Sequence, residues 1–262
     1  MAAQQSDWAE GLKRRYLAGE ASMFLLHGNT RDLCRLDGPD GEAQYLGLVP
    51  FLEAMLSRSK DIVLTYNVSQ GIGFAAGPMR KHCLMAVNAR RAIEGEPVLD
   101  RFPRGAAEVL PLLERLVTDT SQRIAVIVDF FETIVPMSDL SYMSDSDKAN
   151  LVAMQRLASD PGLLGSDNLV VLIAEHLSDV HRRVVSSAQL ATLRIPLPTV
   201  ADRQAFIGAE DMAGVEAEMD QAMLAQITAG LSLIQLRGLF RQARQSGAPI
   251  LFRTVSSRKK EI

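Results

Sequence analysis

Two carboxylates follow a strongly apolar stretch of the sequence. Residues 124–128 read Ile-Ala-Val-Ile-Val, a run of strand length, and Asp129 and Glu132 come after it. A carboxylate at the end of a buried strand can hold Mg²⁺ through water, and a neighbouring carboxylate can activate water for attack on a phosphate. Asp129 is thus a candidate metal ligand and, with Glu132, a candidate catalytic residue. The alternative that we favour for Asp129 is a carboxylate that caps the turn after its strand.

The spacing of Glu132 argues against a role in water activation. Phe130 occupies the position directly after Asp129. Side chains alternate in direction along a strand, so Glu132 would share a face with Phe130. If the strand continues, Glu132 lies about 6–7 Å further along it than Phe130. We therefore expect Glu132 to be poorly placed to activate water at a γ-phosphate.

The usual cradle for that phosphate is missing from the sequence. None of the six lysines follows a glycine, so Gly-Lys-Ser/Thr occurs nowhere. The turn at residues 27–32 offers a substitute, a small anion-binding nest at the start of a helix. Its candidate ligands for a bound cofactor are Gly28, Asn29, Thr30 and Arg31. A plain strand-to-helix turn, with Gly28 supplying an unusual backbone angle, is the alternative that we favour.

The elements that must position these residues alternate along the chain. The sequence predicts strands at 22–26, 61–67, 124–128, 169–174 and 190–195, and helices at 7–18, 45–57, 106–118 and 148–159. The strands lack the polar alternation of an open antiparallel sheet, which indicates a mainly parallel sheet covered on both faces. Gly71-Ile-Gly73 is predicted to turn, and residues 77–104, rich in Arg, Gly and Pro, to be an irregular surface stretch.

The pattern changes after Pro198. Three helices are predicted beyond it, at 200–208, 216–228 and 232–245, with no strand of similar strength. We expect a domain boundary at this point. Residues 1–198 would form an α/β core without a phosphate loop, and residues 199–262 a helical lid and the start of a linker.

Composition and charge exclude several kinds of partner. The net charge of −3 gives no reason to expect nucleic acid or an anionic membrane, and no apolar run reaches the roughly twenty residues of a membrane span. Cys34 and Cys83 form no zinc pattern with the histidines. Free thiols fit a reducing compartment, so we expect a cytoplasmic protein.

The order of motifs from residue 106 to 245 resembles the AAA+ ATPase family. A helix precedes Ile-Ala-Val-Ile-Val-Asp129, and three further segments follow: LVVLIAEHLSDVHRRV (169–184), LRIPLPTVADRQAFI (193–207) and ITAGLSLIQLRGLFRQA (227–243). The resemblance covers about half the chain. It implies a three-layer α/β sandwich like that of the P-loop nucleotidases, with a mainly parallel sheet and a small C-terminal helical lid.

The resemblance also implies roles for single residues. The strand ending at Asp129 would be Walker B, and Glu175 or His176 would lie at sensor 1. Glu175 would repel a γ-phosphate and His176 would donate to one; the alternative for both is an exposed strand end. Arg182 and Arg183 lie near the arginine-finger segment, and such fingers contribute about 10³–10⁵-fold in rate. Ion pairs in solvent are the alternative for the two arginines.

The first hundred residues resemble a different module more closely. The segments FLLHGNTRD (24–32) and DIVLTYNVSQGIGFA (61–75) are similar to the first module, which lacks a P-loop, of tandem AAA proteins in cyanobacteria and plastids. In those proteins an intact ATPase module follows. The segment 257–262 resembles the linker between the modules, which implies that this chain is one half of a longer protein.

These inferences lead to one preferred function and two alternatives. We expect a degenerate AAA+-like module that does not hydrolyse ATP, needs no cofactor, and has a structural, assembly or regulatory role. Its partners would be other proteins, an ATPase module of the same polypeptide, or further copies in a homo-oligomer. The first alternative is an active AAA+ remodelling ATPase that binds ATP and Mg²⁺. The second is a non-catalytic subunit like those of clamp loaders, for whose third domain the residues after Pro198 leave no room.

Overall fold

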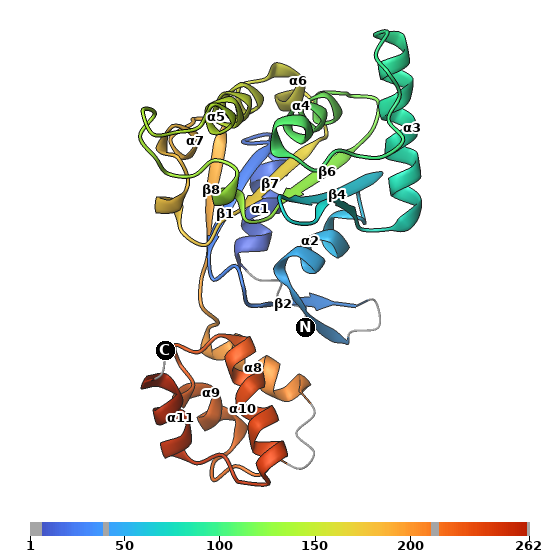
Figure 1. The fold of residues 1–262 in the computed structure, drawn as a ribbon. Helices are drawn as coiled ribbons and strands as arrows, with labels where there is room; N and C mark the ends of the chain where they lie inside the picture. The colour runs from blue at the N-terminus through green and yellow to red at the C-terminus, as the bar shows by residue number, and fades with distance from the viewer. Residues whose placement is uncertain (1–6, 39–41, 211–214, 261–262) are drawn as a thin grey trace. The chain divides into compact units, whose positions relative to one another are not determined.

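The fold is described from a computed structural model for residues 7–38, 42–210 and 215–260. Contacts within the chain divide it into two compact units (Figure 1). Residues up to Thr30, together with Leu48–Ile195, form the N-terminal unit. Arg31–Gly47, together with the residues from Pro196 on, form the C-terminal unit. The chain therefore leaves the first unit after its first strand, contributes a segment to the second unit, and returns.

A six-stranded sheet forms the centre of the N-terminal unit. Its spatial order is β5-β4-β6-β7-β1-β8, and all neighbours are parallel except β4 and β5, which form an antiparallel edge hairpin. The strands are β1 (Met23–Gly28), β4 (Ile62–Asn67), β5 (Gly71–Phe74), β6 (Ile124–Val128), β7 (Leu169–Ile173) and β8 (Leu190–Ile195). The predicted α/β class with a mainly parallel sheet is thus confirmed.

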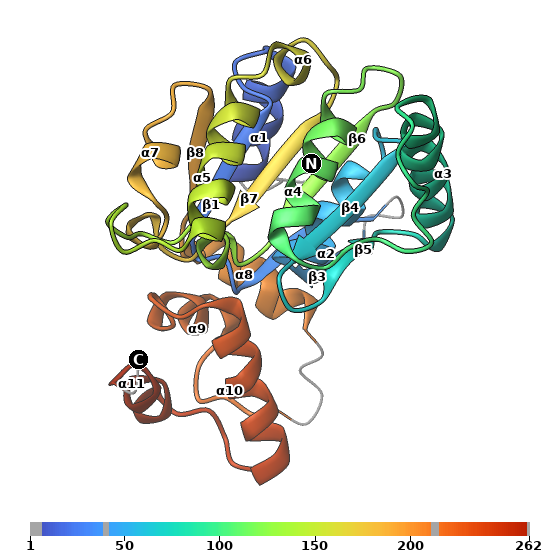
Figure 2. The ribbon, with the colours of Figure 1, turned by 45° about the horizontal axis from the view of Figure 1, so that its top comes forward.

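Helices cover both faces of this sheet. Figure 2 shows α4 and α5 in front of the sheet and α1 behind it. Met23 and Leu25 of β1 belong to the core that α4 and α5 share, whereas Phe24, equally buried, points to the other face. The helices are α1 (Asp7–Leu17), α2 (Leu48–Leu56), α3 (Gly77–Ile93), α4 (Ala106–Val117), α5 (Asp145–Ala158), α6 (Pro161–Leu164) and α7 (Arg182–Val185). Because β6 and β7 are buried at every position, they read as unbroken apolar runs in the sequence.

The stretch at residues 77–104, predicted to be irregular, contains the helix α3. Pro78 lies in its first turn, where proline is tolerated because the N–H there needs no partner within the helix. Of its residues, Cys83 and Val87 are buried. An apolar stripe of two residues is too narrow to reveal a helix by periodicity, so the prediction was wrong.

Two shorter predictions were also wrong. Gly71-Ile-Gly73 is part of β5, because the Asn67 carboxamide oxygen accepts from the N–H groups of Ser69 and Gln70, at 3.1 and 2.8 Å, and turns the chain back onto β4. The helix predicted from residue 45 begins at Leu48. The residues before it pair as a strand of the C-terminal unit.

The C-terminal unit combines a hairpin with four described helices. The hairpin is β2 (Leu33–Asp37) and β3 (Ala43–Gly47), and the helices are α8 (Val200–Ala209), α9 (Gln221–Ile227), α10 (Leu233–Ser246) and α11 (Phe252–Lys260). The second helix begins later than predicted, and α11 extends over residues assigned to a linker. The ring of Tyr45 on the hairpin packs edge-on against Phe206 of α8, with centroids 4.8 Å apart.

Asp32 ties the hairpin to α10 within this unit. Its two carboxylate oxygens accept from the N–H groups of Leu233 and Ile234, at 3.0 and 2.9 Å, and its side chain is buried. A carboxylate here satisfies two backbone donors that the helix leaves unpaired and also lies at the positive end of its dipole. The residues that follow β1 are therefore committed to the fold of the helical unit.

Candidate functional site

The predicted site residues gather at the carboxyl edge of the sheet. The connection after β1 runs past β7 and β6 to β4, whereas the connection after β7 crosses over β1 to β8. Ligands of open α/β sheets bind where the order reverses in this way, outside the carboxyl ends of the strands. Gly28, Asp129 and Glu175 lie at the ends of β1, β6 and β7. Since β7 separates β1 from β6, and Gly28 lies two residues beyond the level of Asp129, the two residues are about 12 Å apart.

The backbone donors at the end of β1 are already bonded to the protein. The N–H of Gly28 donates to the carbonyl oxygen of Glu175 at 3.0 Å, and that of Asn29 donates to the carbonyl oxygen of Ile195 at 2.9 Å. The N–H of Thr30 donates to the carbonyl oxygen of Gly28 at 2.8 Å. An anion-binding nest needs N–H groups that point outward without a partner. These three donors are directed into the sheet and the turn.

Glycine is required at position 28 by two features. The backbone φ of Gly28 is +95°, a region that other residues rarely adopt. A Cβ there would lie 2.7 Å from the carbonyl oxygen of Ile195, the same atom that accepts from Asn29. Gly28 therefore brings the end of β1 close against β8.

The turn does not lead into a helix, which corrects the prediction of a helix start at residues 27–32. The strand β2 follows it, so no helix dipole is aimed at the turn. The hydroxyl of Thr30 is buried and has no hydrogen-bond partner within the described part of the chain. Arg31 is exposed and belongs to the C-terminal unit.

Asp129 ends β6 in a tight backbone feature. Its N–H donates to the carbonyl oxygen of Tyr66 at 2.9 Å, and its Oδ1 accepts from the N–H of Phe130 at the same distance. Phe130 has φ 53° and ψ 45°, a left-handed conformation that is uncommon for a bulky residue. The carbonyl of Phe130 accepts from both the N–H and the hydroxyl of Thr133, at 2.9 and 2.7 Å. These bonds hold Phe130 in its strained conformation, with 43% of its surface exposed.

Glu132 lies in a 3-10 turn rather than on an extended strand. Residues Phe131–Thr133 form this turn directly after Phe130. The alternation of side chains that we expected for a continuing strand therefore does not apply, because β6 ends at Val128.

Glu175 and His176 are exposed at the end of β7. The backbone of this strand end is fixed by two bonds to β1: Ala174 donates to Leu26 at 3.1 Å, and the carbonyl of Glu175 accepts from Gly28. The contribution of Glu175 to the structure is thus its main chain, a role that its residue type does not reveal in the sequence.

Two family models match the chain. Residues 3–196 match the N-terminal Rossmann-like domain of the AAA+ chaperones, and residues 201–262 match their second helical domain. The chain belongs to the AAA+ chaperone family. The predicted membership of the AAA+ family is thus confirmed. No curated protein matches the chain. Among the helices of the described residues, none is long and apolar enough to cross a membrane.

The end of β1 does not fit the Mg²⁺ and triphosphate that the AAA+ fold implies. The N–H groups of Gly28 and Asn29 are bonded to Glu175 and Ile195, and a hairpin takes the place of the phosphate-binding helix. No lysine follows a glycine anywhere in the sequence. The turn therefore lacks both the free N–H donors and the lysine of a phosphate-binding loop.

Arg182 and Arg183 begin the short helix α7 of this AAA+ chain and are both exposed. Neither forms an ion pair with a residue that the structure describes. Each guanidinium is therefore available to an external partner. An arginine finger needs the same availability.

His181 positions these two arginines. His181 is buried, and its ring Nδ1 accepts from the backbone N–H of Arg183 at 3.2 Å. The backbone N–H of His181 donates to the carbonyl oxygen of Val135 at 3.1 Å. Burial lowers the pKa of His181, and the charges of Arg183 and Arg182 lower it further. The cap requires an unprotonated Nδ1, so the neutral imidazole is the form that the fold stabilises. This residue was missed in the sequence because histidine is not a frequent N-cap.

Replacing Gly28 with alanine should lower the free energy of unfolding by about 3 kcal/mol, because it adds both backbone strain and a clash with Ile195. Urea unfolding followed by circular dichroism measures this loss. Gly11→Ala is the matched control: a Cβ at Gly11, within α1, meets nothing within 4 Å, so that variant should gain about 0.5–1 kcal/mol. Equal stability of the two variants would contradict the geometry described for Gly28.

The stability of the chain should fall as the pH drops below about 6.5, the usual pKa of histidine. His181 has a lowered pKa in the fold, so below that pH the unfolded state binds more protons, at up to about 1.4 kcal/mol per pH unit. His181→Asn keeps a capping side chain and should flatten this slope. His27, whose pKa burial also lowers, is present in both proteins, so the difference between their urea-unfolding curves from pH 8 to 5.5 isolates His181. Parallel slopes would refute this role.

Proposed function

We propose that this chain is an AAA+ module that does not hydrolyse ATP and that acts by binding other protein modules. The observation that carries the proposal is the use of the Gly28 and Asn29 N–H groups by Glu175 and Ile195. A nucleotide would have to break bonds of the sheet to obtain these donors, and each buried group left without a partner would cost about 1–3 kcal/mol. A protein-binding role agrees with an AAA+ fold in which the sheet is intact but the N–H groups after β1 are bonded within the protein.

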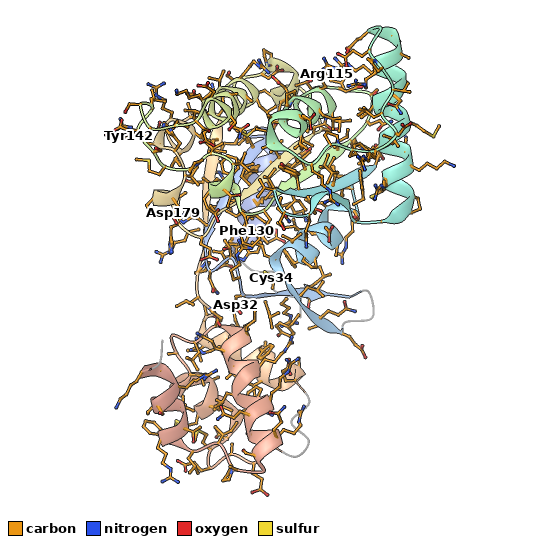
Figure 3. All side chains as sticks on the ribbon, viewed as in Figure 1. Asp32, Cys34, Arg115, Phe130, Tyr142 and Asp179 are labelled. Atoms are coloured by element: carbon orange, nitrogen blue, oxygen red, sulfur yellow. The ribbon has the colours of Figure 1, made fainter. Side chains whose placement is uncertain are left out.

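The connection between β6 and α5 supports the binding role. Its exposed apolar side chains, with their exposed fractions, are Phe130 (43%), Met137 (51%), Leu140 (37%) and Tyr142 (85%). Figure 3 labels Phe130 and Tyr142 on the N-terminal unit. Single exposed apolar residues are normal, whereas apolar patches mark interaction surfaces, and we propose that these four residues contribute to one. Tyrosine in particular is enriched among the residues that dominate interfaces.

This connection is held in place by hydrogen bonds before any partner binds. The N–H of Met137 donates to the carbonyl oxygen of Asp179 at 2.8 Å, and that of Tyr142 donates to the carbonyl oxygen of Asp139 at 2.9 Å. The buried carboxamide of Asn150 donates to the carbonyl oxygen of Ile134 at 3.1 Å. A preformed surface binds with less loss of conformational entropy than a mobile one. The exposure of the apolar residues in this segment could not be predicted, because the sequence does not show which single apolar residues face solvent.

The partner that we propose is another AAA+ module, either a further copy of this chain or an ATP-hydrolysing module. In such an assembly this module would supply a rigid surface, and its partner would supply the chemistry. Exposed Arg182 and Arg183 follow Val180, which pairs with Pro136 of this connection, and they would take part in the contact.

Mg·ATP should neither bind the chain nor stabilise it. A site with a dissociation constant of about 50 µM would add about 2.7 kcal/mol at about 5 mM nucleotide and raise Tm by roughly 5 °C. We expect no shift in a thermal melt and no heat of binding in calorimetry. Micromolar binding that Asp129→Asn abolishes and the exposed-site control Asp139→Asn leaves intact would overturn the proposal.

Tyr142→Ser should weaken association between copies of the chain about tenfold or more, since removing an anchoring tyrosine costs at least about 1–2 kcal/mol. Sedimentation velocity over a concentration series measures this association. Leu17→Ser removes a residue of comparable exposure (71%) at the end of α1 and should leave it unchanged. An equal effect of both variants would contradict the assignment of this surface, and a chain that stays monomeric at every concentration would rule out a further copy as the partner.

A further inference from the structure

A cavity of about 340 Å³ lies between α3 and α4, far from the carboxyl edge of the sheet. Ile124, the first residue of β6, lines it, whereas Asp129 follows the last residue of the same strand. The rise along a strand separates these two residues by about 16 Å. All the residues that line the cavity belong to the N-terminal unit. The cavity is therefore independent of the nucleotide edge.

The inner wall of the cavity is apolar. Aliphatic side chains from both helices, from the segment between them and from β6 form it: Val87, Leu99, Pro111, Leu112, Leu116 and Ile124. Several of them also belong to the core of the unit. A volume of this size, bounded mainly by apolar side chains, is in the range of small-molecule sites.

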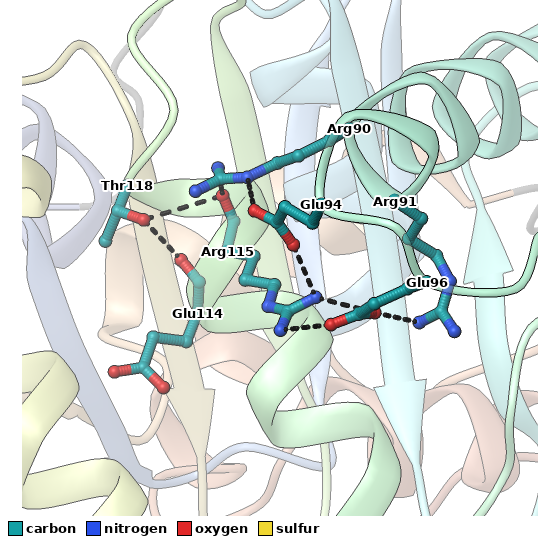
Figure 4. A network of polar contacts seen from close by, with 7 residues as sticks. All are labelled: Arg90, Arg91, Glu94, Glu96, Glu114, Arg115 and Thr118. Carbon is teal, nitrogen blue, oxygen red and sulfur yellow. Dashed lines mark hydrogen bonds and ion pairs between the residues drawn. The ribbon is translucent and has the colours of Figure 1, made fainter.

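The rim of the cavity carries three arginines, and all are paired (Figure 4). Arg115 binds both carboxylate oxygens of Glu96, at 3.0 and 2.8 Å, and also lies 3.1 Å from Glu94. Arg90 donates to Glu94 at 3.0 Å, and Arg91 lies 2.9 Å from Glu96. Two-point pairing within a network holds side chains in one arrangement more firmly than single surface pairs do. The network therefore fixes the segment after α3 against α4 and holds the mouth in place.

The charge at the rim decides the chemistry of the occupant. Arg90, Arg91 and Arg115 are paired with Glu94 and Glu96, so the positive charge at the rim is largely offset. Glu108 and Asp119 also line the cavity and would repel one. An anionic ligand would lose its hydration without gaining a partner, which is costly in an apolar site. A cation would have to leave water for an inner wall that offers it no polar partner, which is equally costly. A neutral molecule loses little and gains the burial of its surface.

We infer that the cavity between α3 and α4 binds a small, neutral and predominantly apolar molecule of about two to three rings. This site is separate from the proposed protein-binding surface and does not depend on it. Ligand binding would tie α3 to α4 through contacts that the two helices lack in the free chain.

A pair of fluorescent probes with the same skeleton tests the inference on the whole chain. N-phenyl-1-naphthylamine is neutral, and 1-anilinonaphthalene-8-sulfonate adds one negative charge to it. We expect saturable binding of the neutral probe with one site per chain, and binding of the sulfonate at least tenfold weaker. Absence of saturable binding by the neutral probe, or equal affinity for both, would overturn the inference.

Ala86→Phe, at a residue that lines the cavity, should weaken binding of the neutral probe at least tenfold by filling the space. Ala92→Phe adds the same side chain at an exposed position of α3 outside the cavity and should leave binding unchanged. Methyl NMR gives a measurement on the unaltered chain, in case Ala86→Phe does not fold. The probe should shift the methyl signals of Leu112 and Ile124, and shifts confined to other residues would refute the site.

Discussion

Two hydrogen bonds close the end of β1 between its neighbours. The N–H groups of Gly28 and Asn29 donate to the carbonyls of Glu175 and Ile195, and the positive φ of Gly28 is what lets the backbone come near enough to β8. In a phosphate-binding loop these donors face outward and the chain continues into a helix. Here they complete the sheet, and the next residues serve the helical unit, where Asp32 caps α10. The same two hydrogen bonds thus occupy the N–H groups that a phosphate would need and direct the chain toward the hairpin.

The sheet could be predicted from the sequence because β6 and β7 are buried on both faces and therefore read as unbroken apolar runs. Gly28 and Asp129 were recognised as candidates because each follows an apolar run of strand length. The helix α3 could not be predicted, since only Cys83 and Val87 are buried in it. The hydrogen bonds of the Gly28 turn also could not be predicted, because the acceptors, the carbonyls of Glu175 and Ile195, are far from Gly28 in the sequence. The hairpin after β1 depends likewise on a contact with α10 that no local pattern shows.

Membership of the AAA+ chaperone family establishes the architecture of the chain, and the function rests on the sites it carries. At the carboxyl edge, Phe130 stands in a strained conformation directly after Asp129. The same connection presents Tyr142 and Leu140 to solvent on a backbone that is already ordered. The protein-binding surface that we propose therefore includes the segment that directly follows Asp129.

Amide hydrogen exchange at Gly28 and Asn29, followed by NMR with and without Mg·ATP, tests the central claim most directly. If the sheet already holds both N–H groups, their exchange is slow in the free chain and does not change when the nucleotide is added. Rapid exchange of either amide in the free chain, together with protection by Mg·ATP, would show that the donors are available to a phosphate and would contradict the account.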